Sequence, residues 1–397
     1  MAKTPVNGIV LSGGGARGAY EVGVLAGMID VLGLRPGDPA PFQVYSGTSV
    51  GAINVSFLAA NAHRGDLSID DLVETWSNLN LETHLRLDLF GLTGFRDRLF
   101  RRRVAEKGRA LIDPTALERV VQDHIPWEQL HRNVDAGHVH SLVVAALRVF
   151  DGQTTLFVET SPETEFRASR DPRRTAISSR INAANVLASA SIPLIFPVRQ
   201  VEGQWYCDGS LRSNTPIAPA LRSGADRIMV VSLLHQDPER STPPLNQPYP
   251  SPLVLLGKVL NALLLDPVTY DLQVLGRLNR ILGVLDEALG PKSRAKVDAV
   301  TVDARGMPYR QVDTLIFSPS EDLGELAGQH LRDLDRSKQL GRLGGWLLRR
   351  AAREEASWEL DLASYILFDG EYAQRLIEVG REDAHRRADE IRTFFSH

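Results

Sequence analysis

One short stretch constrains the fold of this chain more than any other: residues 45–51, with the sequence YSGTSVG. It follows a short apolar run and precedes a run of small and apolar residues at 52–60, which is typical of a buried helix. A strand that turns directly into a helix around Gly-x-Ser-x-Gly is the nucleophile-elbow pattern, in which the serine lies at the tip of a strained turn. Gly47 and Gly51 leave space for that turn, and the helix N-terminus favours negative charge beside the Ser49 hydroxyl. Because the pentapeptide also occurs by chance, its strand–turn–helix context carries the prediction.

The composition is that of a globular protein with a sizeable core. Of 397 residues, 43% are hydrophobic, which excludes a disordered chain, and the net charge of -4 gives no indication of a nucleic-acid partner. Cys207 is the only cysteine, so we expect no internal disulfide and no cysteine-based metal cluster. The N-terminus shows no apolar signal segment, and the longest apolar run, residues 253–265, is too short to span a bilayer. We therefore expect a soluble, cytoplasmic protein.

A glycine-rich loop follows the first predicted strand, residues 6–12. The loop, GGGARG at residues 13–18, leads directly into a predicted helix over residues 19–31. Such a turn exposes several backbone N–H groups and suits an anion. Three interpretations fit it: a site for a dinucleotide pyrophosphate, because the loop matches the string G-x-G-x-x-G; a site for the oxyanion of a tetrahedral acyl intermediate; or a tight turn without a ligand.

The next predicted strand favours the oxyanion. The dinucleotide fingerprint requires an acidic residue about 20 residues further on, at the end of a second strand. The strand over residues 42–45 ends instead in the turn that carries Ser49. Two adjacent strand–helix units place the loop and Ser49 at the same edge of a parallel sheet, outside the carboxyl ends of the strands, where ligands bind in α/β sheets.

Residues 68–124 have a helical pattern and form a predicted insertion. Ser68 and Asp71 resemble a capping box at its start. Within it lies a basic stretch with interleaved aromatic residues, FRDRLFRRRV at residues 95–104. Two interpretations of this stretch remain open: a solvated charged face, or a cap over the site that contacts anionic lipid headgroups.

The second half of the chain alternates predicted strands with turn signals. The turns at Asp151-Gly152 and Glu202-Gly203 predict two hairpins, and the second hairpin leads into Asp208-Gly209. A small-residue helix is expected over residues 182–191, and a linker rich in proline and serine over residues 237–252. The remaining predicted elements are strands at 139–149, 154–158, 199–201, 204–206, 227–234 and 313–318 and helices at 253–289 and from 321 to the end.

Four of these features resemble the patatin-like phospholipase family when they are taken in order. That family has a Gly-Gly-Gly-x-[Arg/Lys]-Gly loop, a Gly-x-Ser-x-Gly elbow, an Ala-Ser-rich segment that ends in proline, and an Asp-Gly-[Gly/Ala] turn. In this chain they correspond to residues 13–18, residues 47–51, the segment ASASIP at residues 188–193, and Asp208-Gly209. The resemblance covers roughly residues 6–235.

The resemblance assigns a role to each matching residue. Ser49 matches the nucleophile and Asp208 its proton acceptor. The oxyanion loop comprises Gly13, Gly14, Gly15, Arg17 and Gly18, and the elbow and turn are supported by Gly47, Gly51 and Gly209. The family implies an α/β/α sandwich around a mostly parallel sheet, hydrolysis of acyl esters in phospholipids or lysophospholipids, transient contact with a membrane surface, and a Ser–Asp dyad without histidine, metal or cofactor. Ser210 stands where the family has Gly or Ala, and we expect this second hydroxyl to leave the reaction class unchanged.

The chemistry also follows from the residue types. Ester hydrolysis needs a nucleophile whose proton is removed during attack, and donors for the charge on the carbonyl oxygen. A free carboxylate, with a pKa of about 3.9, is a poor base for a serine hydroxyl, but burial and a direct hydrogen bond would make Asp208 more competent. Two rival hypotheses are an α/β-hydrolase esterase with a Ser49–Asp208–His235 triad and a non-enzymatic module that binds a nucleotide through residues 13–18. Cys207 is a weaker candidate nucleophile, because a cysteine that ends a strand is more often a small buried side chain.

These expectations divide the chain into a core and an extension. We expect an acyl-hydrolase core over residues 1–320, with a cap insertion at about 65–125 and a helical insertion at about 252–290. A charged, helical extension follows over residues 321–397. Its composition fits homo-oligomerisation, membrane docking or plain packing, and the sequence leaves these open.

Overall fold

The computed structural model describes residues 4–79, 86–87, 112–193, 195–235, 266–337 and 363–396. The basic stretch at 95–104 and the linker at 237–252 lie outside these residues, so both interpretations of the stretch stay predictions.

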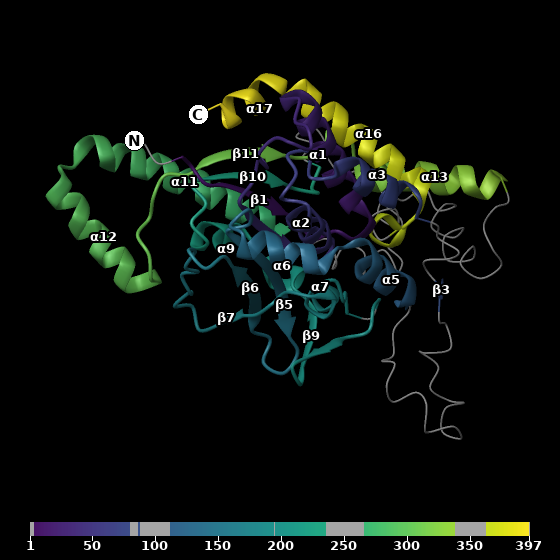
Figure 1. Cartoon of the computed structure of the whole chain (residues 1–397), viewed down its shortest axis with the longest axis horizontal. Helices are drawn as coiled ribbons and strands as arrows, with labels where there is room; N and C mark the ends of the chain where they lie inside the picture. The colour runs from purple at the N-terminus through teal and green to yellow at the C-terminus, as the bar shows by residue number, and fades with distance from the viewer. Residues whose placement is uncertain are drawn as a thin grey trace, which may run out of the picture.

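A mostly parallel sheet of nine strands forms the centre of the described part of the chain (Figure 1). Its order is β11–β10–β1–β2–β5–β6–β7, in which the strands from β11 to β5 are all parallel and β6 is antiparallel to β5. A hairpin of β8 and β9 joins the sheet through β5. The strands are β1 (Asn7–Leu11), β2 (Val44–Thr48), β5 (Ser141–Arg148), β6 (Thr154–Thr160), β7 (Arg174–Ser178), β8 (Arg199–Val201), β9 (Gln204–Asp208), β10 (Arg227–Val231) and β11 (Asp313–Phe317), while β3 (Arg86–Leu87) and β4 (Ile112–Asp113) pair separately. The two strand–helix units predict that β1 and β2 are parallel neighbours, and this prediction is confirmed.

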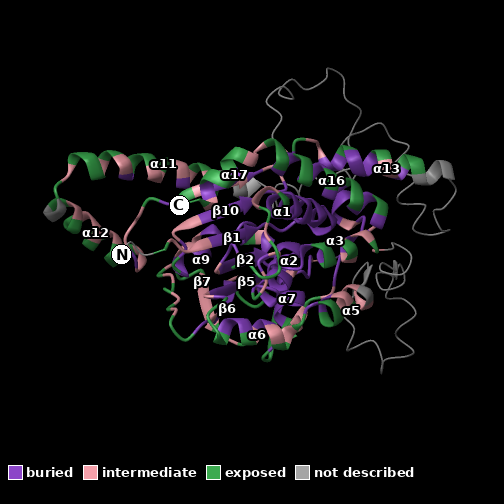
Figure 2. Cartoon of the chain, turned by 45° about the horizontal axis from the view of Figure 1, so that its top comes forward, coloured by how far each residue is buried: buried purple, intermediate pink, exposed green. Residues whose placement is uncertain are grey.

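Helices cover both faces of this sheet. Alternate residues of β1 face two different cores: Ile9 and Leu11 pack in the cluster that contains α1 and α2, whereas Val10 packs with α9 and α11. Figure 2 shows α2 and the central strands β1, β2 and β5 almost wholly buried, whereas β7, α11 and α12 are mainly intermediate or exposed. The predicted α/β fold is thus confirmed. The helices are α1 (Gly18–Leu32), α2 (Val50–Ala60), α3 (Ile69–Ser77), α5 (Thr115–His124), α6 (Trp127–Asp135), α7 (Ala183–Ser189), α8 (Ser210–Ser213), α9 (Ile217–Arg222), α11 (Asp266–Ala288), α12 (Pro291–Arg305), α13 (Leu323–Ser337), α16 (Gly370–Arg386) and α17 (Ala388–Phe395), with a 3₁₀ turn, η1, at Gly15–Arg17.

The C-terminal helix α16 packs closely along α1. A Cβ at Gly23 would lie 2.2 Å from the Ile377 carbonyl oxygen, and one at Gly27 would lie 2.8 Å from the Arg381 carbonyl oxygen. These two glycines, four residues apart on one face of α1, let the helix backbones approach one another. Because α1 begins at the end of the glycine loop, α16 supports the helix that follows this loop.

Some predictions from local sequence signals are confirmed and one is wrong. Both predicted hairpins are present, as β5–β6 and β8–β9. The predicted capping box at Ser68 is wrong: Ser68 has a left-handed backbone, and its hydroxyl donates to Asn61 Oδ1 at 3.1 Å instead of capping α3. In the described residues, no helix combines the length and the apolar character needed to cross a membrane.

Candidate active site

The register of three strands brings Ser49 and Asp208 together. Along one edge of β5, β2 runs parallel and ends with Thr48 opposite Ala145. Along the same edge β9 runs antiparallel and ends with Asp208 opposite Ala146. The carboxyl ends of β2 and β9 therefore meet head to head at two consecutive positions of β5. A nucleophile that follows one strand and an acid that ends the other must then be neighbours.

Ser49 and Asp208 are hydrogen-bonded directly. The Ser49 hydroxyl donates to Asp208 Oδ2 at 2.6 Å, and the backbone N–H of Ser210 donates to Oδ1 at 2.8 Å. Asp208 is fully buried and Ser49 nearly so. Burial raises the pKa of the Asp208 carboxyl from 3.8 to about 6, although both hydrogen bonds favour the ionised form. The carboxylate is consequently a stronger base than an exposed aspartate and is still ionised at neutral pH.

The turn that holds Ser49 is strained and has no room for side chains at its glycines. Ser49 adopts φ 55° and ψ -126°, an uncommon conformation for a residue with a side chain. A Cβ at Gly47 would lie 2.4 Å from the Gly51 carbonyl oxygen, and one at Gly51 would lie 2.4 Å from the Leu11 carbonyl oxygen. A Cβ at Gly209 would likewise lie 2.2 Å from the Ala145 carbonyl oxygen. All three glycines are thus required by close backbone contacts around the site.

Ser189, the last residue of α7, holds the strained turn in place. Its hydroxyl accepts the backbone N–H of Ser49 at 2.8 Å and donates to the Ala145 carbonyl oxygen at 2.6 Å. The Asp208 N–H in turn donates to the Ser191 carbonyl oxygen at 2.9 Å. The small-residue segment at 188–193 therefore contacts both the elbow and the Asp208 turn.

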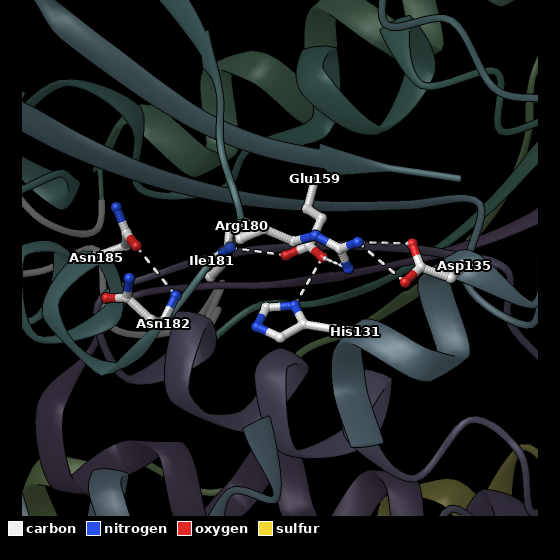
Figure 3. Close-up of polar contacts among 7 residues, drawn as sticks. All are labelled: His131, Asp135, Glu159, Arg180, Ile181, Asn182 and Asn185. Atoms are coloured by element: carbon white, nitrogen blue, oxygen red, sulfur yellow. Dashed lines mark hydrogen bonds and ion pairs between the residues drawn. The ribbon is translucent and has the colours of Figure 1, made fainter. Parts of the chain in front are cut away.

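A polar cluster fixes the start of α7 (Figure 3). Glu159 Oε2 accepts the backbone N–H of Ile181 at 2.7 Å, while Oε1 lies 2.7 Å from His131 Nδ1. Glu159 pairs with Leu142 on β5, three positions before Ala145, so this cluster lies about 10 Å along the strand from the elbow. It anchors the connection to α7 and takes no part in the Ser49–Asp208 pair. Its members are His131, Asp135, Glu159, Arg180 and Ile181, together with the capping pair Asn182 and Asn185.

The glycine loop lies beside Ser49 and is pinned by Asn214. The Gly13 N–H donates to Asn214 Oδ1 at 2.8 Å, so this donor is already engaged. In the described part of the chain we find no acceptor for the N–H groups of Gly14 and Gly15. Gly18 packs against Val50, where a Cβ would lie 2.4 Å from Val50 Cγ2, so the loop and the elbow helix are in direct contact.

Arg17 contacts the C-terminal part of the chain. Its Nε donates to the Ser364 hydroxyl at 2.7 Å, and its guanidinium lies 4.3 Å from the centre of the Tyr365 ring. Arg17 is buried beneath these residues. The loop residue that the resemblance places beside the oxyanion site therefore joins the loop to residues 364–365.

His235 lies beside a backbone carbonyl and Cys207 is a buried thiol, whereas Asp208 accepts the Ser49 hydroxyl. His235 Nδ1 lies 2.8 Å from the Pro319 carbonyl oxygen, while the Ser49 hydroxyl donates directly to Asp208. Cys207 is buried, and burial raises the pKa of its thiol to about 11, so it stays protonated at neutral pH. In the described residues, no group of three or more His, Cys, Asp or Glu side chains is arranged to hold a metal ion.

Val50, the residue after Ser49, is one of the residues that line an apolar cavity. Helices α2, α3 and α5 form its walls, with Phe196 and Phe368 from more distant parts of the chain. Its lining residues are Val50, Ile53, Phe57, Leu72, Thr75, Trp76, Leu79, Leu117, Val120, His124, Ile125, Phe196 and Phe368. Apart from Thr75 and His124, the lining residues are aliphatic or aromatic, so the lining favours an apolar group over a polar one.

A family model described as patatin-like phospholipase matches residues 9–221, more than half of the chain and a range that includes both Ser49 and Asp208. The chain belongs to the patatin-like phospholipase family. This family comprises carboxylic ester hydrolases and implies a lipid substrate. The predicted membership and enzyme class are thus confirmed.

Two solved structures are similar to this chain at low identity. VipD from Legionella pneumophila is 15% identical with a TM-score of 0.34, over 94% of this chain and 92% of that one. Human GIVD cytosolic phospholipase A2, in complex with methyl γ-linolenyl fluorophosphonate, is 14% identical with a TM-score of 0.38, over 99% of this chain and 60% of that one. A comparison with curated proteins gave no match.

The roles of Ser189 and Asn214 were not predicted from the sequence. For Ser189 there was a signal, because it lies in the Ala-Ser-rich segment, but the pattern does not show which hydroxyl meets the elbow. Asn214 stands outside every motif. Its role depends on a contact between residues 201 positions apart, and a single sequence contains no trace of that contact.

Proposed function

We propose that this patatin-like phospholipase is a serine lipid acyl hydrolase that acts through Ser49 and Asp208. The observation that supports this most is the 2.6 Å hydrogen bond between the Ser49 hydroxyl and a fully buried carboxylate. It supports a mechanism in which Ser49 is the nucleophile and Asp208 the base, without a third residue.

The proposed reaction has two halves. The Ser49 oxygen attacks the ester carbonyl carbon while its proton moves to Asp208 Oδ2, and the N–H groups of Gly14 and Gly15 bind the resulting oxyanion. The C–O bond to the alcohol then breaks, the alcohol takes the proton from Asp208, and an acyl-enzyme remains. Water attacks that acyl group with Asp208 again as the base, which releases a fatty acid and restores the Ser49 hydroxyl.

The apolar cavity is the proposed site for the acyl chain. Val50, the residue after Ser49, contributes to its lining, so an acyl chain bound there would lie close to Ser49. Phospholipid and lysophospholipid esters both carry such chains, and both remain candidate substrates.

Two rival functions have less support. In a Ser–Asp–His triad the histidine stands between the other two residues, whereas here Ser49 donates directly to Asp208. In a nucleotide-binding module the glycine loop would bind a pyrophosphate, and neither the direct Ser49–Asp208 pair nor the apolar cavity would be needed.

A fluorophosphonate probe tests the proposal. We expect the wild-type protein to be labelled at Ser49 and to release fatty acid from a mixed phospholipid extract, as measured by mass spectrometry. A folded Ser49→Ala variant should show neither. Residual hydrolysis by that variant well above background, with an unchanged circular dichroism spectrum, would refute the assignment, and an unlabelled wild type would favour the binding module.

A further inference from the structure

The C-terminal segment of residues 363–369 lies on the glycine loop. A Cβ at Gly15 would be 2.0 Å from the Tyr365 carbonyl oxygen, so the two backbones are in contact. The hydrogen bond and the ring contact of Arg17 with Ser364 and Tyr365 attach the same segment a second time. Ser364 and Tyr365 are both buried, so this contact is part of the interior of the protein.

The same segment supplies one wall of the apolar cavity. Phe368 stacks on Trp76 with 6.2 Å between ring centres and an interplanar angle of 21°. Both rings line the same cavity as Val50. Trp76 is held in turn by a hydrogen bond of 3.1 Å from its Nε1 to Asn54 Oδ1, on the elbow helix.

Phe368 is also fixed from its C-terminal side. A Cβ at Gly370, two residues later, would lie 2.2 Å from the Ser77 carbonyl oxygen at the end of α3. From Gly370 onward, α16 packs against α1. The ring therefore has little freedom to leave the cavity, and a chain that reaches it meets a rigid surface.

We infer that residues 363–368, which lie beyond the family match at 9–221, complete the active site, and that Phe368 limits the length of the acyl chain. This inference rests on the proposed function and concerns its substrate range. Phe368 acts here as a specificity-determining residue, while the contact of Tyr365 with Gly15 fixes the position of the loop.

The test is the acyl-length profile of Phe368 variants. The substrates are nitrophenyl esters from butyrate to decanoate, kept below their micellar concentrations. Phe368→Ala opens room for roughly two methylene groups, and burying each one changes the equilibrium constant for transfer from water by about fourfold. We expect the ratio of kcat/KM for decanoate to that for butyrate to rise by about tenfold or more. Phe368→Trp should lower the same ratio.

Phe395→Ala is the matched control. It removes the same ring from the C-terminal part of the chain, but Phe395 packs against Phe42, away from the cavity. Its acyl-length profile should equal that of the wild type. Rates are normalised to the fraction of protein that a fluorophosphonate titrates, so that unfolded variants do not distort the profile.

The outcomes separate the two proposals. An active wild type whose Phe368 variants titrate fully but keep the wild-type profile would overturn the inference and leave the proposed function intact. A profile that shifts equally in Phe395→Ala would also overturn it, because the effect would then be general loosening. A wild type that hydrolyses none of the esters and is not labelled would instead overturn the proposed function.

Discussion

Asp208→Asn separates the chemical role of the carboxylate from its effect on stability. The amide keeps the shape of the side chain and can still accept the Ser210 N–H, but it cannot take a proton from Ser49. Because a positioned general base contributes about a hundred- to ten-thousand-fold, we expect turnover to fall within that range. The same substitution should stabilise the fold at neutral pH, since it removes a buried charge.

The magnitude follows from the pKa of Asp208. Burial raises it from 3.8 to about 6, a difference that corresponds to roughly 3 kcal/mol between the two protonation states. Between pH 4 and 6 the folded protein keeps a proton on Asp208 that the unfolded chain has lost. The free energy of unfolding therefore falls as the pH rises through this window, and above it the contribution of Asp208 stays constant. Asparagine carries no such penalty, and since the pKa of about 6 already includes the effect of the hydrogen bonds, we expect a net gain of about 1 to 3 kcal/mol above pH 6.

Urea unfolding of both proteins at pH 8, 6 and 4.5 measures this gain, alongside initial rates on a soluble ester at pH 8. Asp208→Asn should be the more stable protein at pH 8, and the difference should shrink towards pH 4.5. A variant that is less stable than the wild type at pH 8 would refute the argument that burial dominates at Asp208. A variant that keeps more than a tenth of the wild-type rate would refute its role as the base.

Three further predictions concern the site, and a fourth concerns the basic stretch at residues 95–104. For the wild type, log kcat/KM on a soluble ester should fall by about one per pH unit below about pH 6 as Asp208 protonates, and a profile that is flat down to pH 4.5 would contradict this. His235→Ala should change kcat/KM only a few-fold, whereas a loss as complete as that of Asp208→Asn, in a folded protein, would restore the triad. Ser189→Ala leaves the Ser49 N–H and the Ala145 carbonyl without their buried partner. In urea unfolding, the free energy of unfolding should fall by about 2 to 4 kcal/mol, and the rate of ester hydrolysis should fall as well. Equal stability and rate would mean that the elbow needs no support from α7. Charge reversal at residues 101–103 should weaken binding to anionic liposomes in a sedimentation assay, more at low salt, while equal binding would return this stretch to the solvated-face interpretation.

The fold was predictable where the signals are local. Glycine-rich turns after short apolar runs mark the two strand–helix units, and Asp-Gly and Glu-Gly turns mark the hairpins. The edge strand β7 was not predicted, because Arg174–Ser178 is only partly buried and lacks a clear apolar alternation. Ser68 was read wrongly, since its side chain found Asn61 in place of the helix N-terminus, and the sequence alone does not show that competing partner.

The candidate site was predictable in its motifs but not in its geometry. Ser49 and Asp208 each stand in a recognisable turn, yet their contact depends on which edge of β5 receives β9. Pairing registers depend on contacts between distant residues, and nothing in the segment from Gln204 to Asp208 specifies Ala146 as the partner of Asp208. The same limit applies to Phe368, whose place in the cavity depends on the packing of α16 against α1.

The site contains several features that each destabilise the fold, and close backbone contacts at glycines hold them in place. Ser49 has a positive φ, Asp208 holds a charge out of water, and the N–H groups of Gly14 and Gly15 have no acceptor among the residues that the structure describes. Each is held by a backbone contact that leaves no room for a Cβ, at Gly47, Gly51, Gly209 and Gly15. Such contacts are rigid, because no side chain can move aside to release them. A Ser–Asp pair lacks the histidine that would bridge a wider gap, so the proposed nucleophile and base need to be held at hydrogen-bonding distance by the backbone itself. The head-to-head ends of β2 and β9 on β5 meet that requirement.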